Sequence, residues 1–165
     1  MKKLKQISNA VNTAVSYAGM IFFIVLIVAC VAQVFFRFVL NNSLSWSEEL
    51  ARYCFIWMHM LGASLLIEAN GHATVTAVLD LLHGTVRKIV DIVIELIVFF
   101  NGTVMLYAGI KLAWSSRMNL STALSVPMWC INGSVVVGGL LLMFQAFVAI
   151  AVILTASNGK EESAV

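Results

Sequence analysis

Four long apolar runs, separated by short polar stretches, organise this sequence. The first carries no charge from Gln6 to Phe36, which corresponds to about 46 Å of helix at 1.5 Å per residue. A bilayer core of roughly 30 Å needs about 20 apolar residues in a helix, and all four runs can meet that length. The pattern therefore predicts an all-α membrane protein with transmembrane helices at about residues 11–36, 46–67, 89–113 and 128–155.

A shorter segment at about residues 73–83 lies between the second and third runs. Its apolar residues Val75, Val78, Leu79 and Leu82 are spaced by three or four, which gives a helix one apolar face. The segment is too short to cross a bilayer, so we expect a short interfacial helix on the membrane surface. No linker divides the chain, and residues 1–165 are expected to form a single membrane domain.

Local signals indicate where the helices end and pack. Ser45 can cap the second helix, with Glu48 reaching back to the Ser45 amide as in a capping box. The pair at 70–71, Asn-Gly, is typical of a helix end. Ser134 and Gly138 form a small-xxx-small pair, which predicts a close helix contact in the fourth run.

Composition excludes several classes of protein. The chain is 61% hydrophobic and 11% charged, whereas soluble domains carry about 25% charged residues. A net charge of +2 is too small to suggest a nucleic-acid partner. Cys30, Cys54 and Cys130 lie 24 and 76 residues apart, which fits no metal motif, so we expect buried thiols and no metal site.

Basic residues near the helix ends predict the topology. With the amino terminus inside, the cytoplasmic side holds six of them and the other side four, a bias that favours both termini inside (N-in/C-in). The cytoplasmic set is Lys2, Lys3, Lys5, Arg87, Lys88 and Lys160, and the opposite set is Arg37, Arg52, Lys111 and Arg117. Residues 27–30 resemble a lipoprotein cleavage box, but the apolar run continues too far for a signal peptide.

One face of the second helix is unusually polar. Positions 48, 52, 55, 59, 62 and 66 fall within about 80° of one another at 100° per residue. They hold Glu48, Arg52, Phe55, His59, Gly62 and Leu66. Such a face is expected to pack against another helix or another subunit. Two interpretations of its charges stay open: an i,i+4 pair with a cap, or a cluster of Arg37, Glu48, Glu49 and Arg52 that docks a partner at the outer surface.

Other ionisable residues allow more than one function. His59 suits a proton relay or a hydrogen-bonded packing residue. Arg87, Asp91 and Glu95 follow at intervals of four and form a stripe, which suits internal pairing, a salt bridge to another subunit or an ion site. No Ser/His/Asp set, phosphate loop or zinc spacing occurs, so we do not expect an enzyme.

Several segments are familiar when taken together. They are Trp46-Ser47-Glu48-Glu49-Leu50-Ala51-Arg52-Tyr53, then Trp57, Gly62-Ala63 and Gly71-His72, and finally Ser125-Val126-Pro127-Met128-Trp129. Their order and spacing resemble the small membrane subunit (Q subunit, DctQ-like) of the tripartite ATP-independent periplasmic (TRAP) transporters. The resemblance covers nearly the whole chain. One departure is the segment 73–76, where the family pattern often has an acidic residue.

The resemblance implies a function and partners. A large permease subunit (M subunit) would carry the substrate and sodium sites, and a periplasmic solute-binding protein (P subunit) would deliver an organic acid such as a C4-dicarboxylate or a sialic acid. This chain would need no cofactor. It would lie among the lipids of the bacterial inner membrane, scaffold the large subunit and help to dock the binding protein. Candidate partner-interface residues are Arg37, Glu48, Glu49, Arg52, Trp57, His59 and His72.

Two alternatives belong to other classes. A haem-b membrane anchor needs axial histidines on separate helices, yet only His59 lies inside a predicted span, while His72 and His83 lie in the connection. A small proton-coupled exporter needs Glu95 to be accessible to solvent.

Overall fold

The computed structural model describes residues 2–42, 44–68 and 85–161, with side chains for 6–42, 44–66 and 86–155. These residues form four helices and no strands, as the apolar pattern predicts. The helices are α1 (Lys2–Phe38), α2 (Ser45–Glu68), α4 (Thr85–Ser115) and α5 (Met128–Glu161). The predicted interfacial helix at 73–83 and His72 lie outside the described residues.

Three of the four described helices are long and apolar enough to cross a membrane. These spans are Gln6–Phe38, Val86–Ser115 and Met128–Thr155. The second predicted span does form the helix α2, but its charged first turns and His59 make it less apolar than the others. A fourth crossing and the N-in/C-in topology therefore stay predictions.

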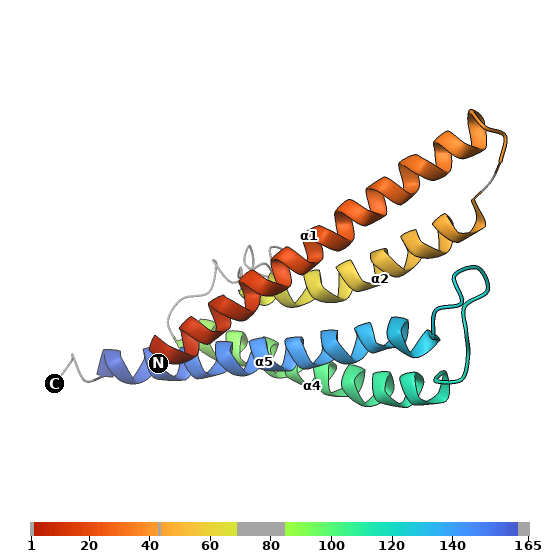
Figure 1. Ribbon diagram of the computed structural model, residues 1–165. Coiled ribbons are helices and arrows are strands. Elements are labelled where there is room, and N and C mark those ends of the chain that lie inside the picture. The colour runs from red at the N-terminus through yellow and green to blue at the C-terminus, as the bar shows by residue number, and fades with distance from the viewer. Residues whose placement is uncertain (1, 43, 69–84, 162–165) are drawn as a thin grey trace.

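The helices form two hairpins, α1 with α2 and α4 with α5 (Figure 1). α2 also packs against α5, whereas α4 packs chiefly against α5. Both chain termini lie at one end of the bundle, which we call the terminus end, and the turns that close the hairpins lie at the opposite turn end (Figure 1). The hairpins lie close together at the terminus end and spread apart toward the turn end.

Glycines allow the close contact between α4 and α5. A Cβ added at Gly139 would lie 2.9 Å from the backbone nitrogen of Leu106 and 3.0 Å from the carbonyl oxygen of Gly102. The predicted small-residue pair is also confirmed, because Ser134 is fully buried and a Cβ at Gly138 would lie 3.1 Å from Cβ of Met60 on α2. α5 thus uses adjacent glycines to approach two different helices.

Buried polar side chains fasten α1 to α5 near the terminus end. The Ser8 hydroxyl donates to Gln145 Oε1 at 3.1 Å, and Gln145 Nε2 donates to Asn12 Oδ1. These three residues are 3–5% exposed. Since unpaired polar groups are costly inside an apolar bundle, this network fixes how the two hairpins meet.

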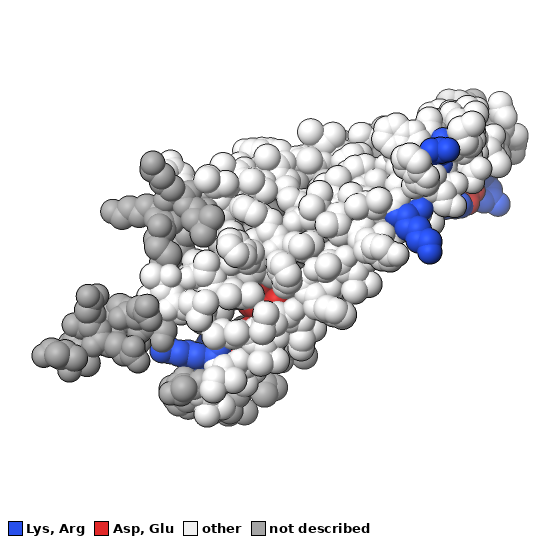
Figure 2. Space-filling model, turned by 90° about the horizontal axis from the view of Figure 1, so that it is seen from below, with Lys and Arg blue, Asp and Glu red and all other residues white. Residues whose placement is uncertain are grey.

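The remaining surface is mostly apolar. Seen from below, Lys and Arg atoms lie toward the two ends of the molecule, and the surface between them is uncharged apart from a small group of Asp or Glu atoms near its middle (Figure 2). The three cysteines are free, but only Cys54 is buried; Cys30 and Cys130 are half-buried, so the prediction of three buried thiols was wrong for these two.

Candidate partner-binding surface

The connection from α4 to α5, residues 116–127, folds into a compact hairpin-like loop at the turn end. The Ser121 amide donates to the Val126 carbonyl and the Met128 amide to the Asn119 carbonyl, both at 2.9 Å. Ser125 adopts the left-handed conformation, with φ of 52°, which turns the chain back toward α5. Its own hydrogen bonds therefore give this loop a defined shape.

Glu49, in the first turns of α2, fastens this loop to the other hairpin. Its Oε2 accepts hydrogen bonds from the Ser121 hydroxyl at 3.1 Å and from the amides of Ala123 and Leu124 at 3.0 and 2.9 Å. Its Oε1 accepts from the Tyr53 hydroxyl at 2.8 Å and from Thr122 at 3.4 Å. The loop rises from the α4–α5 hairpin toward the start of α2 (Figure 1). One carboxylate thus joins two segments more than seventy residues apart.

These contacts stabilise the charged form of Glu49, which lies outside the three apolar spans. Desolvation acts to raise its pKa. The hydrogen bonds from Tyr53, from the Leu124 and Ala123 amides and from Ser121 outweigh that effect and lower the pKa to about 2. Glu49 is therefore ionised at physiological pH and acts as a fixed acceptor.

The predicted cluster of Arg37, Glu48, Glu49 and Arg52 does not assemble within the described chain. Glu48 pairs with Arg52 at 3.2 Å, and this contact takes the place of the predicted reach back to the Ser45 amide. The capping box was therefore wrong. Arg37 instead lies 5.7 Å from the ring of its neighbour Phe38. Of the two interpretations of these charges, an i,i+4 pair or a four-residue cluster, the structure shows the i,i+4 pair directly.

The polar face predicted on α2 is exposed at five of its six positions, and Gly62 is half-buried; we call it the α2 stripe (Glu48, Arg52, Phe55, His59, Gly62 and Leu66). The side chains of Arg52 and Glu48 are 63% and 67% exposed, and nothing lies within 4 Å of a Cβ built at Gly62. His59 is exposed rather than buried. Its Nδ1 lies 3.1 Å from the Phe55 carbonyl oxygen, and its ring contacts the Phe55 ring at 4.0 Å between centroids. No other described helix of this chain covers the stripe.

Two predicted interface positions have internal partners. The Trp57 ring stacks on Phe22 of α1 at 5.7 Å with an interplanar angle of 12°. Glu49 is engaged by the loop. Both side chains therefore hold the bundle together, and the α2 stripe is the part of the predicted interface that faces outward.

The stripe of Arg87, Asp91 and Glu95 runs along the first turns of α4. Arg87 is exposed, Asp91 is half-buried and Glu95 is only 9% exposed. Glu95 Oε2 has no hydrogen-bond partner among the described residues. Glu95 shares a seven-residue repeat with Gly102 and Gly109, both of which face α5, so it points into the α4–α5 contact.

Sequence reasoning missed two polar contacts that shape the bundle. The Ser8–Gln145–Asn12 network joins residues more than 130 positions apart. Its only sequence signal was the isolated polar residues inside apolar runs. The donors to Glu49 include two backbone amides, which carry no sequence signal at all. A helical wheel does, however, place Glu49 about 100° away from Glu48 and off the α2 stripe.

Comparison with known proteins adds the following. The family model described as "Tripartite ATP-independent periplasmic transporters, DctQ component" matches residues 24–156. The sialic acid TRAP transporter small permease protein SiaQ of Vibrio cholerae is 26% identical over 145 residues, covering 88% of this chain and 82% of SiaQ. A putative TRAP transporter small permease protein of Haemophilus influenzae is 25% identical over 129 residues, covering 78% of this chain and 75% of that protein. The sialic acid TRAP transporter permease protein SiaT of Haemophilus influenzae is 29% identical over 101 residues, which are 61% of this chain but only 16% of SiaT.

Proposed function

This chain belongs to the DctQ component family of the tripartite ATP-independent periplasmic transporters, and on that basis we propose that it is the small permease subunit that holds a large permease subunit in place. The two proteins would share the bacterial inner membrane, with this chain crossing it four times and both termini inside. Sodium coupling and solute binding would belong to the large subunit.

The observation that carries this proposal is the α2 stripe. An ion pair, a histidine and an open glycine lie on the outward face of a helix that packs against two apolar spans, α1 and α5. Of the ionisable side chains on the stripe, His59 lies farthest along α2 from the turn end, and an ionisable side chain at membrane depth avoids lipid and marks a contact with protein or water. Gly62 adds a notch into which a side chain of a neighbouring helix can pack. A helix of the large subunit is therefore the proposed occupant.

The buried polar contacts support a static scaffold. Gln145 joins α5 to α1, and Glu49 joins α2 to the 116–127 loop. Both fasten one hairpin to the other. Such contacts suit a support for a moving partner better than a pathway that must open and close.

A second proposed role concerns the 116–127 loop. Beside the Glu48–Arg52 pair, this end of the bundle exposes the large apolar side chains Trp114, Met118 and Leu120, which are 70%, 84% and 62% exposed. A rigid loop with exposed aromatic, aliphatic and charged groups suits contact with a soluble protein. We assign it to docking of the periplasmic binding protein. Two relatives bear sialic acid in their names, so a sialic acid is the proposed solute of the complex.

Co-purification of the large subunit tests the scaffold role. Gly62→Leu fills the notch, and Gly133→Leu is the matched control, because nothing lies within 4 Å of a Cβ at either glycine. Overpacking an interface costs about 1–3 kcal/mol, and 1.4 kcal/mol corresponds to about tenfold in affinity. We expect Gly62→Leu to lower the yield of large subunit about tenfold while Gly133→Leu does not. Equal yields from both variants would refute the assignment of the α2 stripe to this partner.

A further inference from the structure

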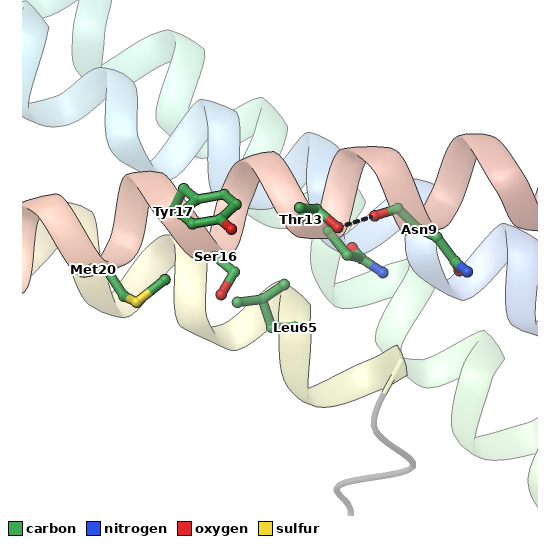
Figure 3. Close-up of a pocket in the computed structure, with 7 residues that line it drawn as sticks. Asn9, Thr13, Ser16, Tyr17, Met20 and Leu65 are labelled. Carbon is green, nitrogen blue, oxygen red and sulfur yellow. Dashed lines mark hydrogen bonds between the residues drawn. The ribbon is translucent and has the colours of Figure 1, made fainter.

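A groove runs along one face of α1 near the terminus end. Its walls come from α1 at positions spaced three or four apart between Asn9 and Met20, and from Leu65 of α2 (Figure 3). It is open to the surroundings and has a volume of about 570 Å³. That volume lies within the roughly 300–1,000 Å³ typical of small-molecule sites.

The chemistry of the groove changes along its length. The part nearer the terminus is lined by amides and hydroxyls, and the part farther along α1 by Met20 and Leu65. After Tyr17 the next polar side chain of α1 is Gln33. The groove therefore straddles the point at which α1 changes from polar to apolar. An amphiphile with a polar head and an apolar tail matches that order.

Two hydroxyl groups in the groove are available to a ligand. The Thr13 hydroxyl is occupied, because it donates to the Asn9 carbonyl oxygen at 2.8 Å. The hydroxyls of Ser16 and Tyr17, in contrast, make no hydrogen bond with the described part of the chain, and Tyr17 is 62% exposed. Figure 3 shows Ser16 extending from α1 toward Leu65, across the groove. Each hydroxyl can donate one hydrogen bond, and a phosphate oxygen is a strong acceptor.

We propose that this groove binds one membrane phospholipid, with its phosphodiester at the Ser16 and Tyr17 hydroxyls and an acyl chain along Met20 and Leu65. No carboxylate lines the groove, so nothing in its wall repels the phosphate. Neutral donors recognise the phosphodiester that all phospholipids share. The two hydroxyls of this site lie on α1, whereas the proposed large-subunit contact is the α2 stripe.

The floor of the groove connects the lipid to the packing of the bundle. Asn12 lines the groove and accepts a hydrogen bond from the buried Gln145 of α5. A lipid seated there would shield the Asn12–Gln145 contact from water. Bound phospholipid should therefore raise the thermal stability of the protein, as any ligand specific for the folded state does.

Native mass spectrometry of the full chain, purified with its partners from membranes in mild detergent, tests the proposal. The wild-type chain is expected to retain one phospholipid. Ser16→Leu combined with Tyr17→Phe removes both hydroxyls and fills part of the groove, and should lower lipid occupancy about tenfold, equivalent to about 1.4 kcal/mol. Tyr107→Phe is the matched control, because Tyr107 is likewise an exposed tyrosine, 72% exposed, and lies on α4 outside the groove. It should keep the lipid.

Tyr17→Phe alone is the second variant. It deletes one exposed oxygen and cannot unfold the bundle, so a fall in lipid occupancy would be caused by the lost hydroxyl. Unchanged occupancy in the double variant, or a folded wild-type chain that retains no phospholipid, would overturn the proposal. Lipid is counted on the ion of this chain after it is released from any partner in the mass spectrometer, so the result does not depend on whether the large subunit co-purifies.

Discussion

The tight backbone contact at Gly139 predicts how α4 and α5 respond to a single added methyl group. In Gly139→Ala the new Cβ would lie 2.9 Å from Leu106 N and 3.0 Å from Gly102 O. Both neighbours are backbone atoms, so neither can rotate away. The helices must separate by about 0.5 Å to restore an ordinary contact of 3.4 Å.

Two opposing terms set the size of this effect. Overpacking of a close contact costs about 1–3 kcal/mol. Alanine is favoured over glycine inside a helix by about 1 kcal/mol. Gly139→Ala should therefore lower the free energy of unfolding by up to about 2 kcal/mol. Gly133→Ala retains only the favourable term, because nothing lies within 4 Å of a Cβ there.

Thermal or SDS unfolding of the purified protein measures both variants. The difference between them, about 1–3 kcal/mol, isolates the packing term, since the change in helix preference is the same in both. Gly139→Ala should melt below the wild type and Gly133→Ala at or above it. Equal stability of the two variants would show that the α4–α5 contact is looser than described.

Four further outcomes are expected. Glu49→Gln replaces one carboxylate oxygen by an NH2 group, which cannot accept hydrogen bonds from the loop. Hydrogen exchange at residues 121–124 should therefore become faster than in the wild type. Because the pKa of Glu49 falls from 4.5 to about 2 on folding, the same protection should be complete above pH 4.5 and be lost as the pH falls toward 2; loss between pH 7 and 5 would contradict this assignment. Gln145→Leu should cost about 1–3 kcal/mol in thermal unfolding, because it leaves buried partners on α1 without their hydrogen bonds; a neutral effect would mean that the network does not fasten the hairpins. Arg52→Ala should change the stability of the chain by less than about 1 kcal/mol, because its pair with Glu48 is exposed, while it should weaken co-purification of the large subunit; a large loss of stability would show a structural role instead.

The apolar pattern predicted the helices well, because a long uncharged run has few alternatives in a membrane. The four described helices begin and end within a few residues of the runs, apart from the longer ends of α1 and α5. The α2 stripe also followed from periodicity alone, since residues at helical spacing share a face in any α-helix. Its exposure did not follow, because a polar face can be buried by the same chain or by another.

The pairing of side chains could not be predicted to the same extent. The adjacent glutamates Glu48 and Glu49 have different surroundings. Glu48 lies on the exposed α2 stripe, whereas Glu49 accepts five hydrogen bonds from Tyr53 and the loop. The position of the 116–127 loop determines which of the two glutamates is hydrogen-bonded within the chain. In the same way, Gln145 could be identified as a polar residue that needs a partner, but its partners depend on how the hairpins meet.

The two hairpins are joined at two places, by Gln145 near the terminus end and by Glu49 at the turn end. A single junction would let one hairpin pivot about the other, whereas two separate junctions oppose such a pivot. A neighbouring protein that moves along this chain would therefore contact a surface whose geometry does not change during the movement. The proposed contribution of this chain to transport would then be to limit the directions in which the neighbouring protein can move.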